Sequence, residues 1–127
     1  MEKKTQKIII DVDNTITIHN SSSSYENKHA NVDVVNKIKE YRDKGYEIIL
    51  FSSRNMKTYD GDISKINLNT LPILTKWLED NNIEYDGIIM GKPWCGEHGF
   101  YVDDKSIRPD EFINLTEQEI HRLLKNQ

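Results

Sequence analysis

The chain has 127 residues, a formal net charge of -4, a hydrophobic fraction of 36% and one cysteine. This length predicts a single domain over residues 1–127, and the acidic balance lacks the basic surface with which proteins bind nucleic acid. A single cysteine excludes an intrachain disulfide, and no apolar run of about 18 residues is present to span a membrane. The short apolar run near the N-terminus does not resemble a signal peptide, so we expect a cytoplasmic protein with no nucleic-acid or membrane partner.

Two buried strands and one amphipathic helix are predicted in the first half of the chain. The run KIIIDVD (7–13) is short, β-branched and without alternation, which is typical of a strand covered on both faces. The polar stretch 16–31, with four consecutive serines, is expected to be a loop. Helical spacing predicts a helix over 32–45, and YEIILFSS (46–53) is expected to be a second buried strand. The helix should bury Val34, Val35, Ile38 and Tyr41 and end at Gly45.

The second half of the chain continues the alternation of strands and helices. Residues 54–69 have no clean period and are expected to be irregular, and 70–82 should form a helix. Strands are predicted at 85–92 and at 99–104, and a final helix at 116–124. The helix at 70–82 should have Thr70 as its N-cap and bury Leu74, Trp77 and Leu78, while Thr116 and Glu119 form a capping box for the last helix.

This order of elements predicts an α/β fold. Strands that alternate with helices usually form a mostly parallel sheet with helices on both faces, so a three-layer sandwich is expected. In such sheets, ligands bind beyond the carboxyl ends of the strands. The residues that the sequence delivers to these ends are Asp11 and Asp13; Ser52, Ser53 and Arg54; Gly91 and Lys92; and Asp103 and Asp104.

The residue types at the strand ends indicate phosphoryl transfer. Several carboxylates that converge without basic neighbours repel one another unless a hard cation such as Mg²⁺ neutralises them. A hydroxyl and an ammonium group can bind the remaining oxygens of a phosphoryl group, whose charge must be balanced in the transition state. One aspartate can then attack phosphorus while another handles the proton of the leaving group.

The sequence resembles the haloacid dehalogenase (HAD) superfamily of phosphatases. DVDNT (11–15) fits its D-x-D-x-T signature, and a serine, a lysine and an acidic pair follow later strands in that superfamily's order. The segments 52–74 and 91–112 are similar to a small group described as capsule polysaccharide biosynthesis phosphatases. The resemblance implies a HAD-like Rossmannoid fold and hydrolysis of a small phosphorylated metabolite through an aspartyl-phosphate. In this group the substrate would be a sugar phosphate for polysaccharide biosynthesis.

The resemblance also implies a role for each residue of the site. Asp11 would be the nucleophile and a Mg²⁺ ligand, and Asp13 the general acid and base, with its backbone carbonyl on the metal. Ser52 would bind the phosphoryl group and Lys92 would hold the nucleophile and neutralise charge. Asp103 would ligate the metal directly, and Asp104 directly or through water. The sequence departs from the pattern at Asn14, where many members have glycine, and at Ser52, where threonine is common.

The sequence offers no room for a cap domain. The insertion points that many superfamily members use contain only residues 16–30 and 55–69, which are too short for a folded core. The active site should therefore be open, for a bulky substrate or for a neighbouring subunit, and a homo-oligomer is one expectation. The specificity loops would be 17–30, 56–69 and 93–99, with Trp94 packing against a sugar or a base.

Several residues have a second interpretation. Asp11 and Asp13 could form a surface turn, although that accounts for one motif and not for four. The phosphate ligand could be Ser53 in place of Ser52, and Lys92 taken alone would be a solvated lysine. Arg54 could bind a substrate anion or pair with a structural carboxylate.

Other functions are alternatives to hydrolysis of a sugar phosphate. A nucleotide is the alternative substrate. A phosphoaspartate receiver module also gathers carboxylates, a hydroxyl and a lysine at strand ends, but its phosphorylated aspartate follows the third strand. An inactive binding partner has no support from a sequence in which all the core catalytic residues are present.

Overall fold

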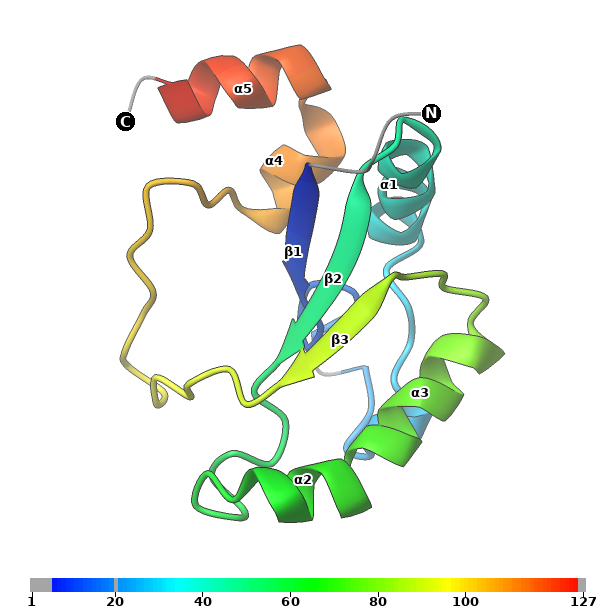
Figure 1. Ribbon diagram of the computed structural model, residues 1–127, viewed down its shortest axis with the longest axis vertical. Coiled ribbons are helices and arrows are strands. Elements are labelled where there is room, and N and C mark those ends of the chain that lie inside the picture. The colour runs from blue at the N-terminus through cyan, green and yellow to red at the C-terminus, as the bar shows by residue number, and fades with distance from the viewer. Residues whose placement is uncertain (1–5, 20, 126–127) are drawn as a thin grey trace. The chain divides into compact units, whose positions relative to one another are not determined.

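The computed structural model describes residues 6–19 and 21–125, and its chain divides into two compact units. The first ends at Trp94 and the second begins at Cys95. Figure 1 shows the order of the elements along the chain, with three strands in the first unit and two short helices in the second. None of the helices in the described ranges is long and apolar enough to cross a membrane.

The first unit contains an open, three-stranded parallel sheet. Its strands are β1 (Lys7–Asp11), β2 (Glu47–Ser52) and β3 (Gly87–Met90), with β2 in the centre. Leu50 of β2 is in register with Ile10 of β1 and with Ile88 of β3. Because all three strands are parallel, their carboxyl ends lie at the same edge. The fold is thus α/β with a parallel sheet, as the alternation of elements predicted.

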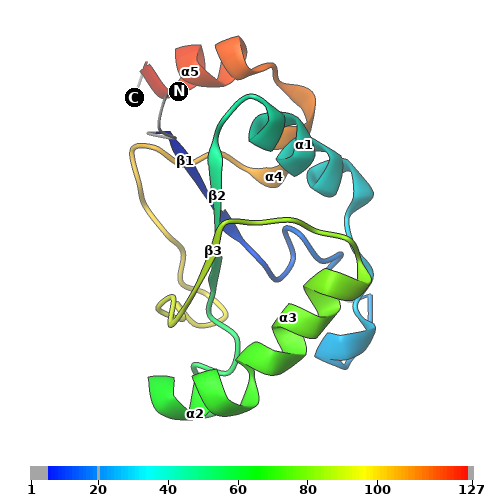
Figure 2. The same cartoon turned by 45° about the vertical axis from the view of Figure 1, so that its right-hand side comes forward.

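Two helices of the first unit bury the apolar stripes that their sequences predicted. They are α1 (Val32–Asp43) and α3 (Leu71–Asp80), which lie on the same side of the sheet in Figure 2. Gly45 has a φ of 99° after the end of α1, in the left-handed conformation typical of a helix C-terminus. The stripes consist of Val34, Val35, Ile38 and Tyr41 in α1 and of Leu74, Trp77 and Leu78 in α3.

The strands alternate in burial more than the sequence suggested. Ile48, Leu50 and Ser52 of β2 are buried, and the residues between them are only partly buried. On the strands at the two edges, Ile9 is 60% exposed and Ile89 is 51% exposed. The expectation that β1 is covered on both faces is not met along its whole length, because α1 and α3 pack on one side.

Two short helices lie where the sequence predicted irregular structure. Residues 63–69 form α2 (Ile63–Asn69), whose N-cap Asp62 accepts a hydrogen bond from the backbone N–H of Lys65 at 3.3 Å. The serine-rich stretch contains η1 (Tyr25–Asn27), a single 3₁₀ turn. Both are too short for a hydrophobic period to reveal them, and only their tertiary contacts make them stable.

The predicted cap of α3 is not made by Thr70. This residue occupies the N-cap position, but its hydroxyl donates to Oδ1 of Asn55 at 2.6 Å and accepts no hydrogen bond from the helix. The hydroxyl thereby ties the start of α3 to the loop after β2. A long-range partner has displaced the local bond that the sequence suggested.

In the second unit, the predicted strand at 99–104 does not form. These residues are exposed and irregular, and the side chains of Phe100, Tyr101 and Val102 are all exposed. A strand needs a neighbour for its backbone N–H and C=O groups, and among the described residues only β1, β2 and β3 pair in a sheet. The helices of this unit are α4 (Pro109–Asn114) and α5 (Glu117–Lys125).

The capping box of α5 is confirmed. The backbone N–H of Thr116 donates to Oε1 of Glu119 at 2.8 Å, and the N–H of Glu119 donates to the hydroxyl of Thr116 at 3.1 Å. Two N–H groups that the helix leaves without an internal partner are thus satisfied by the reciprocal side chains. This local motif was readable from the sequence because its partners are three residues apart.

Candidate active site

The loop after β1 is shaped by two buried side chains. Val12 and Ile16 are both fully buried, and they anchor the loop on either side of the turn. The carbonyl of Val12 accepts the backbone N–H groups of Ile16 at 2.9 Å and of Thr17 at 3.1 Å. Asn14 adopts a left-handed φ of 65°, which asparagine tolerates better than most residues. The loop is therefore rigid, with Asp11 and Asp13 on either side of a buried valine.

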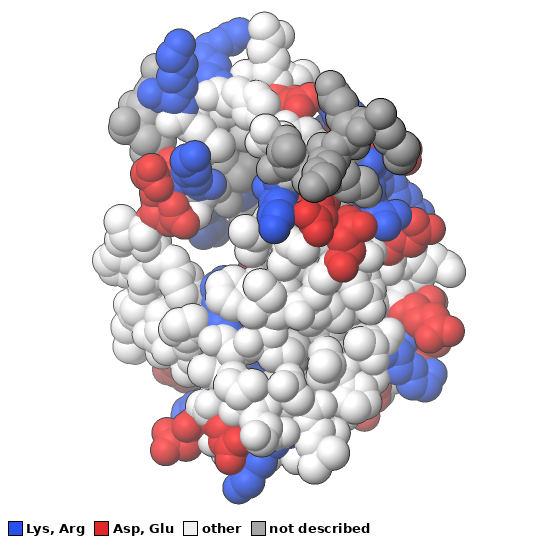
Figure 3. Space-filling model, in the orientation of Figure 1, with Lys and Arg blue, Asp and Glu red and all other residues white. Residues whose placement is uncertain are grey.

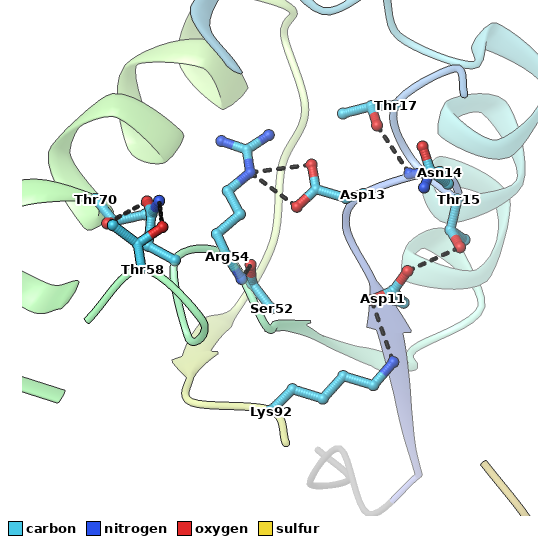
Figure 4. A network of polar contacts seen from close by, with 11 residues as sticks. Asp11, Asp13, Asn14, Thr15, Thr17, Ser52, Arg54, Thr58, Thr70 and Lys92 are labelled. Carbon is cyan, nitrogen blue, oxygen red and sulfur yellow. Dashed lines mark hydrogen bonds and ion pairs between the residues drawn. The ribbon is translucent and has the colours of Figure 1, made fainter. Parts of the chain in front are cut away.

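Asp11 lies between a lysine and a threonine (Figure 4). Nζ of Lys92 is 3.2 Å from its Oδ1, and the hydroxyl of Thr15 donates to its Oδ2 at 3.1 Å. Burial raises the pKa of the Asp11 carboxyl above its ordinary value of 3.8, and the charge of Asp13 raises it further. The charge of Lys92 and the two hydrogen bonds oppose this rise without cancelling it. Ionised Asp11 is thus held in a partly buried place by one cation.

Lys92 reaches Asp11 because the chain turns sharply after β3. Gly91 has a φ of 95°, and a Cβ atom at this position would lie only 2.6 Å from Cδ1 of Ile63. The backbone N–H groups of Gly91 and Lys92 both donate to the carbonyl of Ser52 at 3.0 Å. A glycine is required at this turn, and the two bonds fix the base of Lys92 to the end of β2.

Asp13 pairs with an arginine that is buried. Nε of Arg54 is 3.0 Å from Oδ1 and 3.0 Å from Oδ2 of Asp13, and the side chain of Arg54 has no exposed surface. The ring of Tyr25 lies over the guanidinium, with its centroid 4.3 Å from Cζ of Arg54. Burial and the charge of Asp13 raise the pKa of Tyr25 above 10.0, against the opposing charge of Arg54. The sequence allowed Arg54 either to bind a substrate anion or to pair with a carboxylate. In the structure, its contacts are those of a residue paired with a carboxylate.

Ser52 and Ser53 differ in burial at the end of β2. Ser52 is fully buried, and its hydroxyl oxygen accepts the backbone N–H of Arg54 at 3.1 Å. A hydroxyl has one proton to donate as well as two lone pairs, so Ser52 keeps a donor for a phosphoryl oxygen. Ser53 is only partly buried.

Asp103 and Asp104 lie on the exposed segment of the second unit. Oδ1 of Asp103 accepts the backbone N–H of Lys105 at 2.9 Å, and this bond lowers the pKa of the Asp103 carboxyl. Within 6–19 and 21–125, no group of three His, Cys, Asp or Glu side chains lies close enough together to hold a metal. The structure brings together Asp11, Asp13, Ser52, Arg54 and Lys92 of the predicted set, all in the first unit.

The donor atoms at Asp11 fit a hard cation. Each of its carboxylate oxygens accepts one hydrogen bond or ion pair, from Lys92 or from Thr15. A carboxylate oxygen has two lone pairs, so one on each remains for a metal. Mg²⁺ is usually held by one or two carboxylates and completes its six ligands with waters and phosphate oxygens, so three converging acids are not required.

A shallow cavity of about 320 Å³ lies beside Trp94, also in the first unit. The loop after β2 and the segment after β3 form it, and Trp94 is 50% exposed. Its lining residues are Met56, Lys57, Asp60, Gly61 and Trp94. A larger cavity of about 440 Å³ lies between the end of α3 and the segment before β3, and none of the predicted site residues lines it. The smaller cavity follows the carboxyl ends of β2 and β3 and is the better candidate for a substrate.

Tyr25 and Thr17 belong to this site but were not predicted from the sequence. Tyr25 lies over the guanidinium of Arg54. It is the only aromatic residue between positions 14 and 40, within a stretch dominated by serine and asparagine. A lone tyrosine in a polar stretch was the available signal, but only the folded chain shows its partner. Thr17 was also missed: it is buried, and its hydroxyl accepts the backbone N–H of Asn14 at 2.9 Å.

Figure 3 shows the charged side chains on one face of the structure. Acidic and basic side chains are intermingled around the edge of this view, and its centre is largely uncharged.

Comparisons with known proteins give one strong similarity. No protein-family model matches the chain, and no curated protein matches it. Two chains of the Pnkp1/Rnl/Hen1 RNA repair complex share 21% identity with a TM-score of 0.51, over 77% and 91% of this chain and 30% and 37% of theirs. At that identity they show a common fold alone. The crystal structure of an MCSG target from Vibrio cholerae is 45% identical, with a TM-score of 0.93, over 95% of this chain and 98% of the other. The chain belongs to the same family as this Vibrio cholerae protein.

Proposed function

We propose that the protein is a Mg²⁺-dependent phosphomonoester hydrolase that works through an aspartyl-phosphate, as the HAD phosphatases do. The observation that carries the proposal is the pair of acids after β1. Asp11 is held by Lys92 and Thr15, and Asp13, two residues on, is held by Arg54. A nucleophile and an acid or base are needed on one rigid loop, and this arrangement supplies both.

In the first step, a carboxylate oxygen of Asp11 attacks phosphorus. A bond forms between Asp11 and phosphorus while the bond from phosphorus to the alcohol oxygen breaks, and Asp13 gives its proton to that oxygen. Lys92 lies 3.2 Å from Asp11 and balances the negative charge that gathers there. The hydroxyl oxygen of Ser52 accepts the backbone N–H of Arg54, and its proton is donated to a phosphoryl oxygen.

In the second step, water releases the phosphate. Asp13 is now a carboxylate and takes a proton from water, whose oxygen attacks phosphorus. The bond between Asp11 and phosphorus breaks, inorganic phosphate leaves, and Asp13 keeps the proton for the next cycle. Arg54 keeps Asp13 in place during this step, with Nε 3.0 Å from the carboxylate of Asp13.

A magnesium ion would be held by the carboxylate of Asp11 and the backbone carbonyl of Asp13, with Asp103 and Asp104 as further ligands by resemblance. Bound there, it would neutralise the phosphoryl oxygens and keep two anions close together. The residues of the chain would then carry out the attack on phosphorus, the proton transfer and the orientation of the substrate.

The cavity beside Trp94 supports a sugar phosphate as the substrate, for polysaccharide or capsule biosynthesis. An exposed indole offers a flat apolar face for a sugar ring, and Lys57 and Asp60 offer a donor and acceptors for its hydroxyls. Trp94 is two residues from Lys92, so their Cα atoms are at most about 7 Å apart. That is within the reach of a ring attached to the phosphate. A nucleotide is the second candidate, because a base stacks on the same indole.

An open active site is consistent with a capless HAD phosphatase. The described residues of 16–30 form a loop with one 3₁₀ turn, and 55–69 contain only the short α2, so neither described stretch forms a separate cap domain. The finer fold that we propose is a three-layer, capless HAD-like sandwich over residues 1–127. A bulky substrate or a second copy of the chain would then cover the site.

The first experiment is hydrolysis of p-nitrophenyl phosphate with and without Mg²⁺. The wild type, Asp11→Asn and Asp13→Asn are compared, with Asp43→Asn as the matched control at the exposed end of α1. We expect Mg²⁺-dependent turnover that Asp11→Asn abolishes and Asp13→Asn lowers about 10²- to 10⁴-fold, with the control unchanged. Turnover that survives Asp11→Asn would show that the nucleophile is another residue.

The same proteins separate the phosphatase from a receiver module. A receiver would take up phosphate from acetyl phosphate and keep it with little turnover. A panel of sugar phosphates and nucleotides then tests the substrate. Trp94→Ala should raise KM for the preferred substrate about tenfold and leave p-nitrophenyl phosphate less affected. If activity on both substrates fell equally, Trp94 would have no role in substrate selection.

A further inference from the structure

Arg54 is the most unusual buried group in the described chain. Its side chain has no exposed surface, and its one acidic partner is Asp13. Nη1 and Nη2 are both buried and have no hydrogen-bond partner among the residues that the structure describes. Buried donors without partners are unfavourable, and an apolar side chain of similar volume would avoid them. A guanidinium is therefore not the best choice here for stability alone.

Tyr25 closes this guanidinium off from solvent, and the chain around it holds Tyr25 in place. The segment 18–30 is closed at its base by a bridge between Thr17 and Ala30. Nε1 of Trp77 in α3 donates to the carbonyl of Lys28 at 2.8 Å, so the segment is also tied to a helix. The ring of Tyr25 consequently stays 4.3 Å from Cζ of Arg54.

The contact between Arg54 and Asp13 fixes the direction of the carboxylate. Nε lies at the same distance, 3.0 Å, from both oxygens, so the carboxylate faces Arg54 symmetrically. This contact engages one lone pair on each oxygen and leaves the other for a proton. Asp13 can be held in one orientation and still exchange a proton with substrate or water.

We propose that Arg54 and Tyr25 are positioning residues for Asp13. The short segment 18–30, which carries Tyr25, thereby helps to hold one catalytic carboxylate in place, whereas a cap domain covers a whole site. Arg54 aims the carboxylate, and Tyr25 keeps water from competing for the guanidinium. The proposal rests on the proposed phosphatase function, in which Asp13 transfers the proton. Neither residue touches the phosphoryl group.

The test uses four variants of the full chain. Arg54→Met keeps the volume without the charge, and Arg54→Lys keeps the charge without the planar fork. Tyr25→Phe keeps the ring, and Tyr25→Ala removes it. Arg122→Met in α5 is the control for losing an exposed arginine. Thermal midpoints are measured together with kcat and KM for p-nitrophenyl phosphate at saturating Mg²⁺.

A positioning role predicts a separation of stability from catalysis. Arg54→Met should lower kcat about 100-fold in protein that is still folded at the assay temperature, the loss typical of a misplaced catalytic group, with KM within about twofold. Arg54→Lys should fall between Arg54→Met and the wild type. Tyr25→Ala should lower kcat about tenfold, while Tyr25→Phe and Arg122→Met match the wild type.

Other results would overturn the proposal. If Arg54→Met raised KM and left kcat unchanged, Arg54 would be a substrate contact. If Tyr25→Ala folded and kept a normal kcat, the ring of Tyr25 would have no positioning role. If Arg54→Met does not fold, Arg54→Lys decides: a folded Arg54→Lys with normal kcat would show that only the charge matters.

A second measurement is independent of activity. The Nε–H resonance of Arg54, identified by its loss in Arg54→Lys, should exchange slowly with water in the wild type and in Tyr25→Phe, and rapidly in Tyr25→Ala. Rapid exchange in the wild type would refute the covered geometry itself. A wild type without phosphatase activity but with slow exchange would refute the proposed function, and the pair would then be purely structural.

Discussion

The charge of Asp11 is set by two opposing influences. Burial and the neighbouring Asp13 disfavour the ionised form, while Lys92 and Thr15 favour it. Burial is the larger influence, so the pKa of Asp11 in the folded protein lies above its ordinary value of 3.8. A nucleophile must be ionised to attack, and here ionisation works against folding. Such a conflict is typical of residues kept for function.

This conflict predicts that Asp11→Asn stabilises the protein in Mg²⁺-free buffer. Because the folded pKa is raised, ionisation of Asp11 removes stability as pH rises from about 3.8 through the folded pKa. The variant should therefore match the wild type at pH 3.5 and be more stable at pH 7. Urea unfolding at several pH values measures the difference. A constant difference across this range would mean that the pKa of Asp11 is not raised.

Ser52 and Ser53 should differ in their effect on stability. Ser52→Ala leaves the backbone N–H of Arg54 buried without its acceptor, which typically costs about 1–3 kcal/mol. Ser53→Ala removes a partly exposed hydroxyl and should change stability by less than about 0.5 kcal/mol. Urea unfolding of the two variants checks this. Kinetics of the same pair then identify the hydroxyl that binds phosphate.

Among the elements, the segment 18–30 depends most on its contacts with the rest of the chain. It has one 3₁₀ turn of its own, η1, and η1 packs against α3. The indole of Trp77 joins this helix to the segment, and the bridge between Thr17 and Ala30 closes the loop. Local propensity contributes little to a serine-rich loop, so these contacts decide where Tyr25 lies.

Trp77→Phe should loosen this segment without unfolding α3. The ring keeps most of the buried apolar surface but loses the hydrogen bond to the carbonyl of Lys28, which is worth about 0.5–1.5 kcal/mol. Amide exchange at residues 25–30 should become faster, while exchange in α1 stays unchanged. Trp94→Phe, which changes an exposed indole, is the matched control. Unaltered exchange at residues 25–30 would show that other contacts hold the segment.

At the scale of the whole molecule, the predicted metal ligands are distributed over both compact units. Asp11 and Asp13 belong to the first unit, and Asp103 and Asp104 to the second. Asp103 is exposed, and its contact with the backbone of Lys105 holds its own segment in a turn. Under the proposed function, Mg²⁺ binds the folded chain and not the unfolded one, so it should stabilise the folded chain.

Mg²⁺ should therefore raise the thermal midpoint of the wild type. Binding at 100 times the dissociation constant contributes about 2.7 kcal/mol by mass action. Asp11→Asn should abolish this gain and Asp103→Asn should remove most of it, whereas Asp110→Asn, an exposed acid of α4, should keep it. Differential scanning fluorimetry with Mg²⁺ and with EDTA measures the shift. A full gain in Asp103→Asn would show that Asp103 is not a ligand.

The sequence by itself determined the features that depend on neighbouring residues. Three strands, the buried stripes of α1 and α3 and the capping box of α5 follow from hydrophobic spacing and from partners three or four residues apart. The polar residues at the strand ends were also predictable, because parallel strands bring their carboxyl ends to one edge. These rules need no knowledge of distant contacts.

Only the tertiary structure decided how those residues pair. Lys92 meets Asp11 across 81 positions, and Arg54 meets Asp13 across 41, where no local pattern chooses a partner. Residues 99–104 were predicted to be a strand but pair with no strand among the described residues. Tyr25 acquires a role only because its loop folds over Arg54. The chemistry of a side chain follows from the residue itself, but its burial and its charge partner depend on segments far away in the chain.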